Sequence, residues 1–407
     1  ERITYSLRPT GETPTRGTME RATVETDGPG KTTVHHEIEV FDPALWWPRE
    51  RGRQHRYTLK ASLGESELTV TTGIRDVERD GRSLRVNGEP ITIRGVNLTT
   101  ADVADVDRAL ECNANLIRGH AQVLPPEVYA ACDEAGVLVW QDLPLTGPGE
   151  FDVDRGRDLA TTLDRIYGRY PSLAVTTVHD EPTDAFAEGL GSGRLDALRR
   201  RWRAWRTEYD AGPAQRVADA LPDNIPCFPV VADPGAGSEA RRLFPGWDYG
   251  VAGDASALVG GDTPAIVAEF GAGSLGSGDP SDAADFDREK HDRHVDGDRD
   301  ASQAYQSRVV GTVASSLRLA GVGGIVYSLR DTDEAGLGVY TEDGEPKPAQ
   351  AALSDAFEPL QAFLSDDGRV VVRNELPAGV EAELAWVVGE KSGATPISVD
   401  AGERWDG

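Results

Sequence analysis

From Ile91 onwards, short apolar runs alternate with longer amphipathic stretches, and this repeat constrains the fold more than any other feature of the chain. The runs are continuous rather than alternating, which is typical of parallel strands buried on both faces. Repeated strand-then-helix units over about 250 residues predict a (β/α)8 barrel, which we assign to residues 78–365. The expected strands are Ile91–Asn97, Ala114–His120, Val137–Asp142, Leu173–Glu181, Cys227–Ala232, Ala265–Gly271 and Gly324–Asp331.

The stretches between these runs have the pattern of helices with proline near the start and glycine at the end. One of them opens with Pro125-Pro126 and ends at Gly136. Another carries Trp202 and Trp205, which we expect to pack into the core. A doubly wound sheet is the structural rival, but no glycine-rich phosphate loop follows any of the runs. A serine esterase is disfavoured because no GxSxG elbow is present.

The two ends of the chain have the pattern of antiparallel β structure. Residues 1–77 include Thr32–Phe41 and Tyr57–Leu63, in which polar and apolar residues alternate. They predict an immunoglobulin-like β-sandwich. Residues 366–407 return to strand patterns and predict the start of a C-terminal β-sandwich. Residues 272–300 are rich in Gly, Ser and Asp and predict a long surface loop.

The charge balance excludes several kinds of partner. Formal net charge is −27, and only five of the 42 basic residues are lysine. Nothing cationic is left to neutralise the phosphates of a nucleic acid or to dock on an anionic membrane. Surfaces this acidic and lysine-poor resemble those of salt-adapted, haloarchaeal-type proteins, in which salt screens the self-repulsion. We therefore expect a halophilic protein.

The sequence predicts neither a metal site nor a segment that inserts into a membrane. The three cysteines have no CxxC spacing, so a zinc site is not expected. The acidic run Asp296–Asp300 lacks the glutamate that completes a calcium loop, so we expect neither metal nor cofactor. No apolar run is long enough for membrane insertion. The chain begins with Glu1 rather than Met, so a native N-terminus can lie upstream. We expect a cytoplasmic protein. Whether it forms a homo-oligomer is left open.

In a (β/α)8 barrel, the chemistry is carried out at the carboxyl ends of the strands. Two carboxylates, Glu181 and Glu269, fall at the ends of otherwise apolar runs, where a charge is unfavourable unless it pairs or reacts. A pair of carboxylates facing one cavity is what cleavage of a glycosidic bond requires. The alternative is that each pairs with an arginine such as Arg118 at a strand end.

Several motifs, in chain order over about residues 40–355, resemble family 2 glycoside hydrolases. The motifs are Leu45-Trp46-Trp47-Pro48, Gly73-Ile74-Arg75, Leu84 to Ile91, Arg94-Gly95-Val96-Asn97, Asn113 to Arg118, Cys132 to Trp140, Pro171 to Glu181, Pro264 to Gly271 and Gly344 to Ala349. Each motif is weak by itself, and the ordered series is specific. The segment Trp140-Gln141-Asp142 resembles most the β-mannosidase and exo-glucosaminidase branch of this family.

The resemblance implies a retaining, exo-acting β-glycosidase that uses double displacement on an oligosaccharide or glycoside. Glu269 corresponds to the nucleophile and Glu181 to the acid/base, and Arg118 is a candidate to hold Glu269 anionic. A mannosidase-like specificity is preferred, with β-galactosidase or β-glucuronidase specificity as the alternative. The candidate substrate-binding residues are Asn97, Arg118, His120, Trp140, Asp142, Asp180, Trp247, Tyr249 and Tyr327.

Three positions depart from the pattern of the family. Asp180 replaces an asparagine that contacts the sugar 2-hydroxyl, and an ionised carboxylate can only accept hydrogen bonds. Thr176 or Thr177 stands where tryptophan is common, and Tyr327 replaces a tryptophan of the last strand. Asp180 could accept from a hydroxyl or from the ammonium of an amino sugar. The alternative function is a catalytically weak or inactive carbohydrate-binding protein on the same fold.

Overall fold

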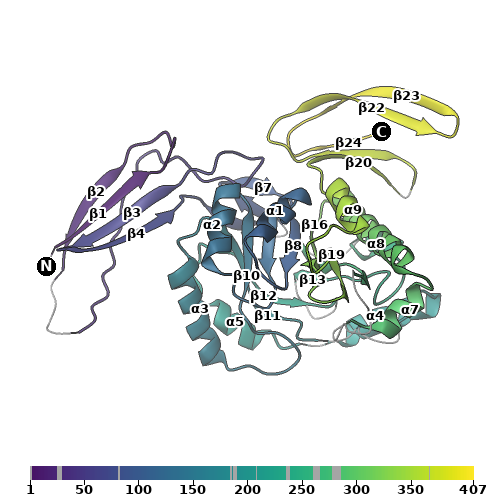
Figure 1. The fold of residues 1–407 in the computed structure, drawn as a ribbon, viewed down its shortest axis with the longest axis horizontal. Coiled ribbons are helices and arrows are strands. Elements are labelled where there is room, and N and C mark those ends of the chain that lie inside the picture. Colours follow the sequence, from purple (N-terminus) through teal and green to yellow (C-terminus); the bar gives the residue numbers. More distant parts are fainter. Residues whose placement is uncertain are drawn as a thin grey trace.

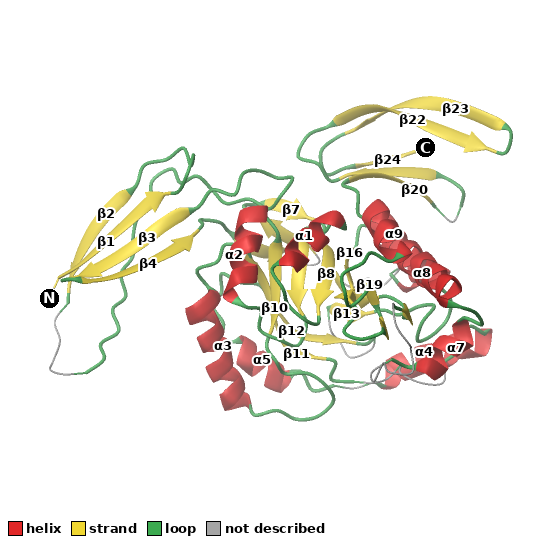
Figure 2. Cartoon of the chain, viewed as in Figure 1, coloured by secondary structure: helices red, strands yellow, loops and turns green. Residues whose placement is uncertain are grey.

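The computed structural model describes residues 2–24, 30–80, 83–183, 186, 190–207, 209–234, 239–259, 266–276, 286–365 and 367–407. A barrel occupies the centre, an N-terminal sheet extends from one side of it, and the C-terminal strands lie near helices α8 (Arg299–Ala320) and α9 (Pro348–Ala356) (Figure 1, Figure 2). Among these residues, no helix is both long and apolar enough to cross a membrane.

The predicted barrel is confirmed. Eight parallel strands close on themselves in the order β8, β9, β10, β11, β12, β13, β14 and β16, and β16 pairs again with β8. Their bounds are β8 Arg94–Leu98, β9 Leu116–Gly119, β10 Leu138–Asp142, β11 Leu173–Asp180, β12 Cys227–Ala232, β13 Ala240–Arg242, β14 Ile266–Phe270 and β16 Gly323–Val326. Every residue of β8, β9, β10, β11 and β14 is buried, as expected for strands covered on both faces.

The helices around the barrel include α1 (Ala104–Glu111), α2 (Pro126–Ala135), α3 (Val153–Tyr167) and α5 (Gly212–Ala218). Helix α2 begins with proline in its first turn and ends at Gly136, whose φ of 73° is left-handed, which confirms the predicted capping. The remaining short elements are β15 Ser274–Leu275, β17 Ser328–Arg330, β18 Ala335–Gly336, β19 Gly338–Tyr340, η1 Ala252–Asp254 and α6 Ala255–Leu258.

Two elements of the barrel are absent from the sequence prediction. Strand β13 has three residues, too few for an apolar run to stand out, and α5 has seven. The loop predicted for residues 272–300 is wrong in part, because β15, α7 (Arg288–His294) and the start of α8 lie within it. Its residues 277–285 lie outside the described part of the chain.

The prediction that Trp202 and Trp205 pack into the core is wrong. Both lie on α4 (Arg194–Arg206), which has no buried residue, and they are 54% and 79% exposed. The reason is that α5, rather than α4, packs against β11 and β12 and takes the barrel position of this repeat. The tryptophan spacing therefore predicts the helix correctly, but the face of the helix that carries the tryptophans is exposed rather than buried.

The N-terminal strands form one antiparallel sheet in the order β2, β1, β3, β4. Their bounds are β1 Arg2–Pro9, β2 Thr18–Thr23, β3 Tyr57–Leu63 and β4 Ser66–Thr72. The strand predicted over Thr32–Phe41 is wrong, because residues 31–40 have no strand pairing in the structure. Their side chains are exposed or half-buried. The polar and apolar residues alternate along this segment, but its backbone forms no hydrogen-bonded ladder with a neighbouring strand.

The amino end of the barrel is closed by a three-stranded sheet, β5 Val77–Asp80, β6 Ser83–Val86 and β7 Glu89–Ile91. Its Val77, Leu84 and Val86 share one buried apolar cluster with Trp46 and with inward side chains of the barrel. The indole of Trp46 donates to the carbonyl of Asp133 (2.9 Å) at the end of α2. The inward side chains at this end of the barrel thus form an apolar cluster.

The C-terminal strands are β20 Leu360–Leu364, β21 Val370–Asn374, β22 Val380–Val388, β23 Lys391–Val399 and β24 Arg404–Asp406. They form two small sheets, β20-β21-β24 and β22-β23, which share a buried cluster of Val372, Ile397 and Val399. Strand β20 begins six residues before the boundary expected from the sequence.

A buried ion-pair network ties the C-terminal strands to the barrel. Arg94 of β8 and Arg318 of α8 are each 1% exposed, and both pair with Glu375, at 2.7 and 3.1 Å. Arg94 also pairs with Glu50, which precedes the N-terminal sheet's third strand. Glu375 and Glu50 together therefore balance the charges of two guanidinium groups that have almost no access to water.

Replacing Glu375 should destabilise the protein strongly. Glu375→Ala removes one partner of a buried network and leaves uncompensated charge, for which about 3–5 kcal/mol is typical. Chemical denaturation followed by fluorescence measures the change. Glu383→Ala, at an exposed position of β22, is the control and should change the free energy of unfolding by no more than roughly 0.5 kcal/mol. Equal effects of both variants would contradict the structural role of the network.

Candidate active site

Charged and titratable side chains meet at the carboxyl ends of five barrel strands. Strands β9, β10, β11, β13 and β14 contribute them, either within the last residues or just after them. The residues are Arg118, His120, Asp142, Asp180, Glu181, Arg242 and Glu269. The sequence therefore placed Glu181 and Glu269 in the right neighbourhood, together with four of the expected binding residues, Arg118, His120, Asp142 and Asp180.

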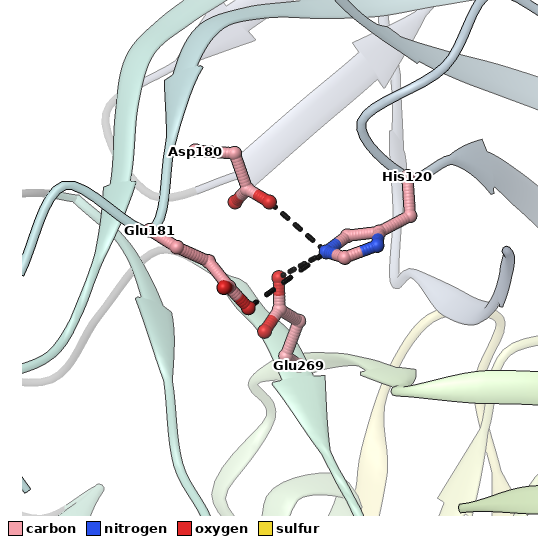
Figure 3. A group of neighbouring side chains, drawn as sticks. All are labelled: His120, Asp180, Glu181 and Glu269. Carbon is pink, nitrogen blue, oxygen red and sulfur yellow. Dashed lines mark ion pairs between the residues drawn. The ribbon is translucent and has the colours of Figure 1, made fainter. Parts of the chain in front are cut away.

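His120 is the centre of the carboxylate group. Its Nε2 lies 2.9 Å from Asp180 Oδ2, 3.3 Å from Glu269 Oε1 and 3.9 Å from Glu181 Oε1 (Figure 3). One oxygen of each carboxylate lies within 4.8 Å of the others. Retaining glycosidases hold their two carboxyl groups about 5–5.5 Å apart, so the spacing of Glu181 and Glu269 suits a direct attack on a sugar.

Glu181 has a strained backbone. Its φ of 52° lies in the left-handed region, which residues other than glycine adopt at a cost, and its amide donates to the carbonyl of Val231 (3.0 Å) on the next strand. This turn directs the side chain back over the barrel, where it is 25% exposed, whereas Glu269 is fully buried. Strain of this kind is common where a side chain must be aimed at a ligand.

Arg118 binds three buried carboxylates at once. Its guanidinium contacts Asp142 and Asp180 at 2.8 Å and Glu269 at 2.9 Å, and all four side chains have no solvent exposure. The group also lies over the ring of Trp140, 5.6 Å from its centroid. The expectation that Arg118 holds Glu269 anionic is met by this geometry, and Asp142 and Asp180 are the other acids that it neutralises.

Arg242 is a functional residue that the sequence prediction missed. It ends β13, and its Nε donates to Glu269 Oε2 (2.6 Å) while a terminal nitrogen pairs with Glu181 Oε1 (2.8 Å). Another terminal nitrogen lies 3.7 Å from Asp233. The available signal was the pair Arg241-Arg242 just before Leu243 and Phe244 in a strongly acidic chain, but the strand is too short to place it.

The surrounding charges shift the pKa values of Glu181 and Glu269 in opposite directions. Burial and the nearby charge of Glu269 raise the pKa of Glu181 to about 7, although Arg242 works against this. Burial alone would also raise the pKa of Glu269, but Arg242, His120 and Arg118 together hold it well below its usual value. Glu269 is therefore ionised at neutral pH while Glu181 can hold a proton there, which is the division of roles that a nucleophile and an acid require.

His120 carries positive charge in this group. Burial disfavours its protonation, but hydrogen bonding and attraction to Asp180 and Glu269 raise its pKa to about 10. Burial likewise raises the pKa of Asp142 to about 6 in spite of Arg118. The site thus gathers four acids around two arginines and one charged histidine.

The three departures from the family's sequence pattern have distinct structural surroundings. Asp180 accepts from Arg118 through Oδ1 (2.8 Å) and faces His120 through Oδ2, contacts that suit a carboxylate. Thr177 accepts from the indole of Trp140 (2.7 Å) inside the barrel. Tyr327 is half-buried and lies edge-on to His120 at 5.5 Å between ring centroids. Asp180 is therefore part of the charge network, and Tyr327 borders it.

Asn97 also lies beneath the group. It is fully buried, and its amide donates to the carbonyl of Ala268 (3.3 Å) on β14. Its Oδ1 has no hydrogen-bond partner among the described residues. Asn97 is therefore placed to support the strand that carries Glu269.

Trp247 and Tyr249, two of the candidate substrate-binding residues, have almost no exposed surface. Trp247 is 4% exposed and stacks on His294, and Tyr249 is 3% exposed with its hydroxyl accepting from the amide of Phe244 (3.3 Å). Trp140 has no exposure and stacks on a ring inside the barrel. These three rings are taken up by core packing, which the sequence could not distinguish from packing against a ligand.

His120, Asp180, Glu181 and Glu269 are also the one group of the described residues whose spacing could hold a metal ion. The donor types suit a divalent cation. However, Arg118 and Arg242 already lie on the oxygens of these carboxylates and would repel a second cation. The electrostatics therefore favour arginine as the counter-ion of this group.

Comparison with known proteins identifies relatives of this architecture. The family model for glycosyl hydrolases family 2 matches residues 2–75. A mannosylglycoprotein endo-β-mannosidase of Lilium longiflorum is 31% identical over 131 residues, which is 26% of this chain and 14% of the relative. An exo-β-D-glucosaminidase of Amycolatopsis orientalis is 32% identical over 127 residues, 26% of this chain and 12% of the relative.

Solved structures match the whole fold. A β-D-mannosidase from Dictyoglomus thermophilum has a TM-score of 0.76 at 16% identity, covering 100% of this chain and 58% of its own. An exo-chitosanase from Amycolatopsis orientalis has a TM-score of 0.71 at 17% identity, with 100% and 56% covered. This chain thus spans a little over half the length of these proteins. The predicted resemblance is confirmed: the chain is similar to family 2 glycosyl hydrolases, with β-mannosidases and an exo-glucosaminidase among its matches.

Proposed function

We propose that this chain carries the catalytic barrel of a retaining, exo-acting β-glycosidase. One observation carries the proposal. Glu181 and Glu269 lie close enough for double displacement, and their surroundings make one a proton donor and the other an anion. The family relationship supports the same reading, since the relatives named above are glycosidases.

Each residue of the group then has a task. Glu269 attacks the anomeric carbon while Glu181 gives its proton to the leaving oxygen, which forms a glycosyl ester on Glu269. Glu181, now ionised, removes a proton from water, and the water displaces Glu269 with overall retention. Arg118 and His120 keep Glu269 anionic through the charges that contact it.

A mannosidase-like specificity is the favoured form of the proposal, and β-galactosidase or β-glucuronidase specificity is the alternative. Support comes from the Trp140-Gln141-Asp142 segment and from the β-mannosidases among the relatives. A 2-amino sugar is one further candidate, because an exo-β-D-glucosaminidase is among the relatives. We also propose that the enzyme works in high salt, as its acidic composition suggests.

A panel of aryl β-glycosides in molar salt tests the function. The β-mannoside should be hydrolysed fastest, and a faster β-glucosaminide would instead favour the amino-sugar candidate. Glu181→Gln should lower kcat/KM by about 10²–10⁴-fold, and Glu269→Gln should abolish turnover. Glu289→Gln, at an exposed site on α7, is the matched control and should behave as the parent. Turnover by Glu269→Gln equal to that of the parent would sink the proposal, and a panel without any turnover would favour the inactive carbohydrate-binding alternative.

The pH dependence follows from the same pair. Glu181 must be protonated to donate, so kcat/KM should fall as pH rises through about 7. Glu269 must be ionised, and its lowered pKa should leave the acidic side of the profile flat down to well below pH 4.5 while the protein stays folded. Initial rates between pH 4 and 9 measure the fall around pH 7 and check that the acidic side stays flat down to pH 4. A rate that rises steadily above pH 7 would contradict the acid role of Glu181.

A further inference from the structure

Arg242 bridges the two carboxylates between which a sugar would have to react. Its nitrogens lie 2.6 Å from Glu269 Oε2 and 2.8 Å from Glu181 Oε1, so one guanidinium joins the two carboxylates. In double displacement, the anomeric carbon and the leaving oxygen must approach these same two side chains. The positions of the guanidinium and of the reacting bond therefore exclude each other. Since this step uses the reactive pair, the inference rests on the proposed function.

The two arginines of the site differ in their freedom to move. Arg118 has no exposure and is held by three buried carboxylates. Arg242 is 15% exposed and ends the shortest strand of the barrel, where the register with β14 is irregular. Asp233 lies 3.7 Å from its outer nitrogen and can keep the charge paired after a rotation of the side chain. Arg242 is therefore the arginine that can withdraw.

Withdrawal of Arg242 changes the charges that face Glu181. The groups around this carboxylate are Glu269, Asp180, Arg242 and His120. Arg242 favours the ionised form of Glu181, and the two acids disfavour it. His120, 3.9 Å away, is the other cation that faces it. Once Arg242 has moved, repulsion by the acids dominates and the pKa of Glu181 must rise.

We propose that Arg242 is a displaceable counter-ion: it bridges Glu181 and Glu269 in the free protein, and a sugar that enters the site moves it aside, so that Glu181 takes up a proton as the sugar binds. Arg242 is thus a positioning residue that acts through Glu181. Glu269 stays ionised through this change, because Arg118 and His120 remain on it. The acid is then protonated when a substrate is present, at a pH where the free protein has largely lost that proton.

Proton uptake on binding tests the proposal without any turnover. The probe is phenyl 1-thio-β-D-mannopyranoside, a neutral sugar with a sulfur link that resists hydrolysis. Titration calorimetry at pH 8 in two buffers of different ionisation enthalpy should show about half to one proton taken up per sugar. Arg242→Gln and Glu181→Gln should each reduce the uptake to near zero. Arg241→Gln, one residue earlier, is the matched control and should keep it. Unchanged uptake in Arg242→Gln would overturn the proposal, as would binding to the parent without uptake.

A measurement on the free protein separates this inference from the proposed function. Carboxyl ¹³C resonances, with that of Glu181 assigned by its loss in Glu181→Gln, report its titration without a ligand. In Arg242→Gln the Glu181 midpoint should move up by about one pH unit or more, and Arg242→Lys should restore it largely. If no sugar binds, the glycosidase proposal fails while this titration still tests Arg242. An unmoved midpoint would refute the role of Arg242 as counter-ion.

Discussion

The guanidinium of Arg118 is the interaction on which the rest of the site depends. Asp142, Asp180 and Glu269 come from three different strands and are buried without exposure, which would be prohibitive for unpaired charges. Arg118 binds all three at 2.8–2.9 Å and thereby fixes the ends of β10, β11 and β14 relative to β9. With these strand ends fixed, Glu181 follows Asp180 into a turn that returns it to Glu269.

The apolar half of the barrel makes this polar half possible. The small sheet β5-β6-β7 and Trp46 close the amino end, so the inward side chains there can be wholly apolar. The charges are then gathered at the opposite end, where Arg118, His120 and Arg242 each have acids as neighbours. The low dielectric of this setting strengthens every pairing and drives the proton affinities of Glu181 and Glu269 apart. The apolar side chains that fill the amino end of the barrel stabilise the fold, and the charged side chains at its carboxyl end form the candidate site.

The sequence predicted the barrel because seven of its strands are apolar runs with clear ends, and it predicted Glu181 and Glu269 because charges at such ends are unusual. It missed Arg242 because β13 has only three residues, which is too short for a strand to be recognised from the sequence pattern. It misassigned Trp247 and Tyr249 because an aromatic ring packs equally well against the core or against a sugar. Pattern shows where a strand ends; it does not show which rings remain uncovered once the helices have packed.

The central claim is that Glu269 becomes covalently bonded to the sugar. Mass spectrometry of the protein after incubation with a 2-deoxy-2-fluoro-β-mannosyl fluoride tests it most directly. We expect one fluorosugar per chain, attached to the peptide that contains Glu269, and no label in Glu269→Gln. Turnover of an unfluorinated substrate with the label on a different residue, or with none, would contradict it.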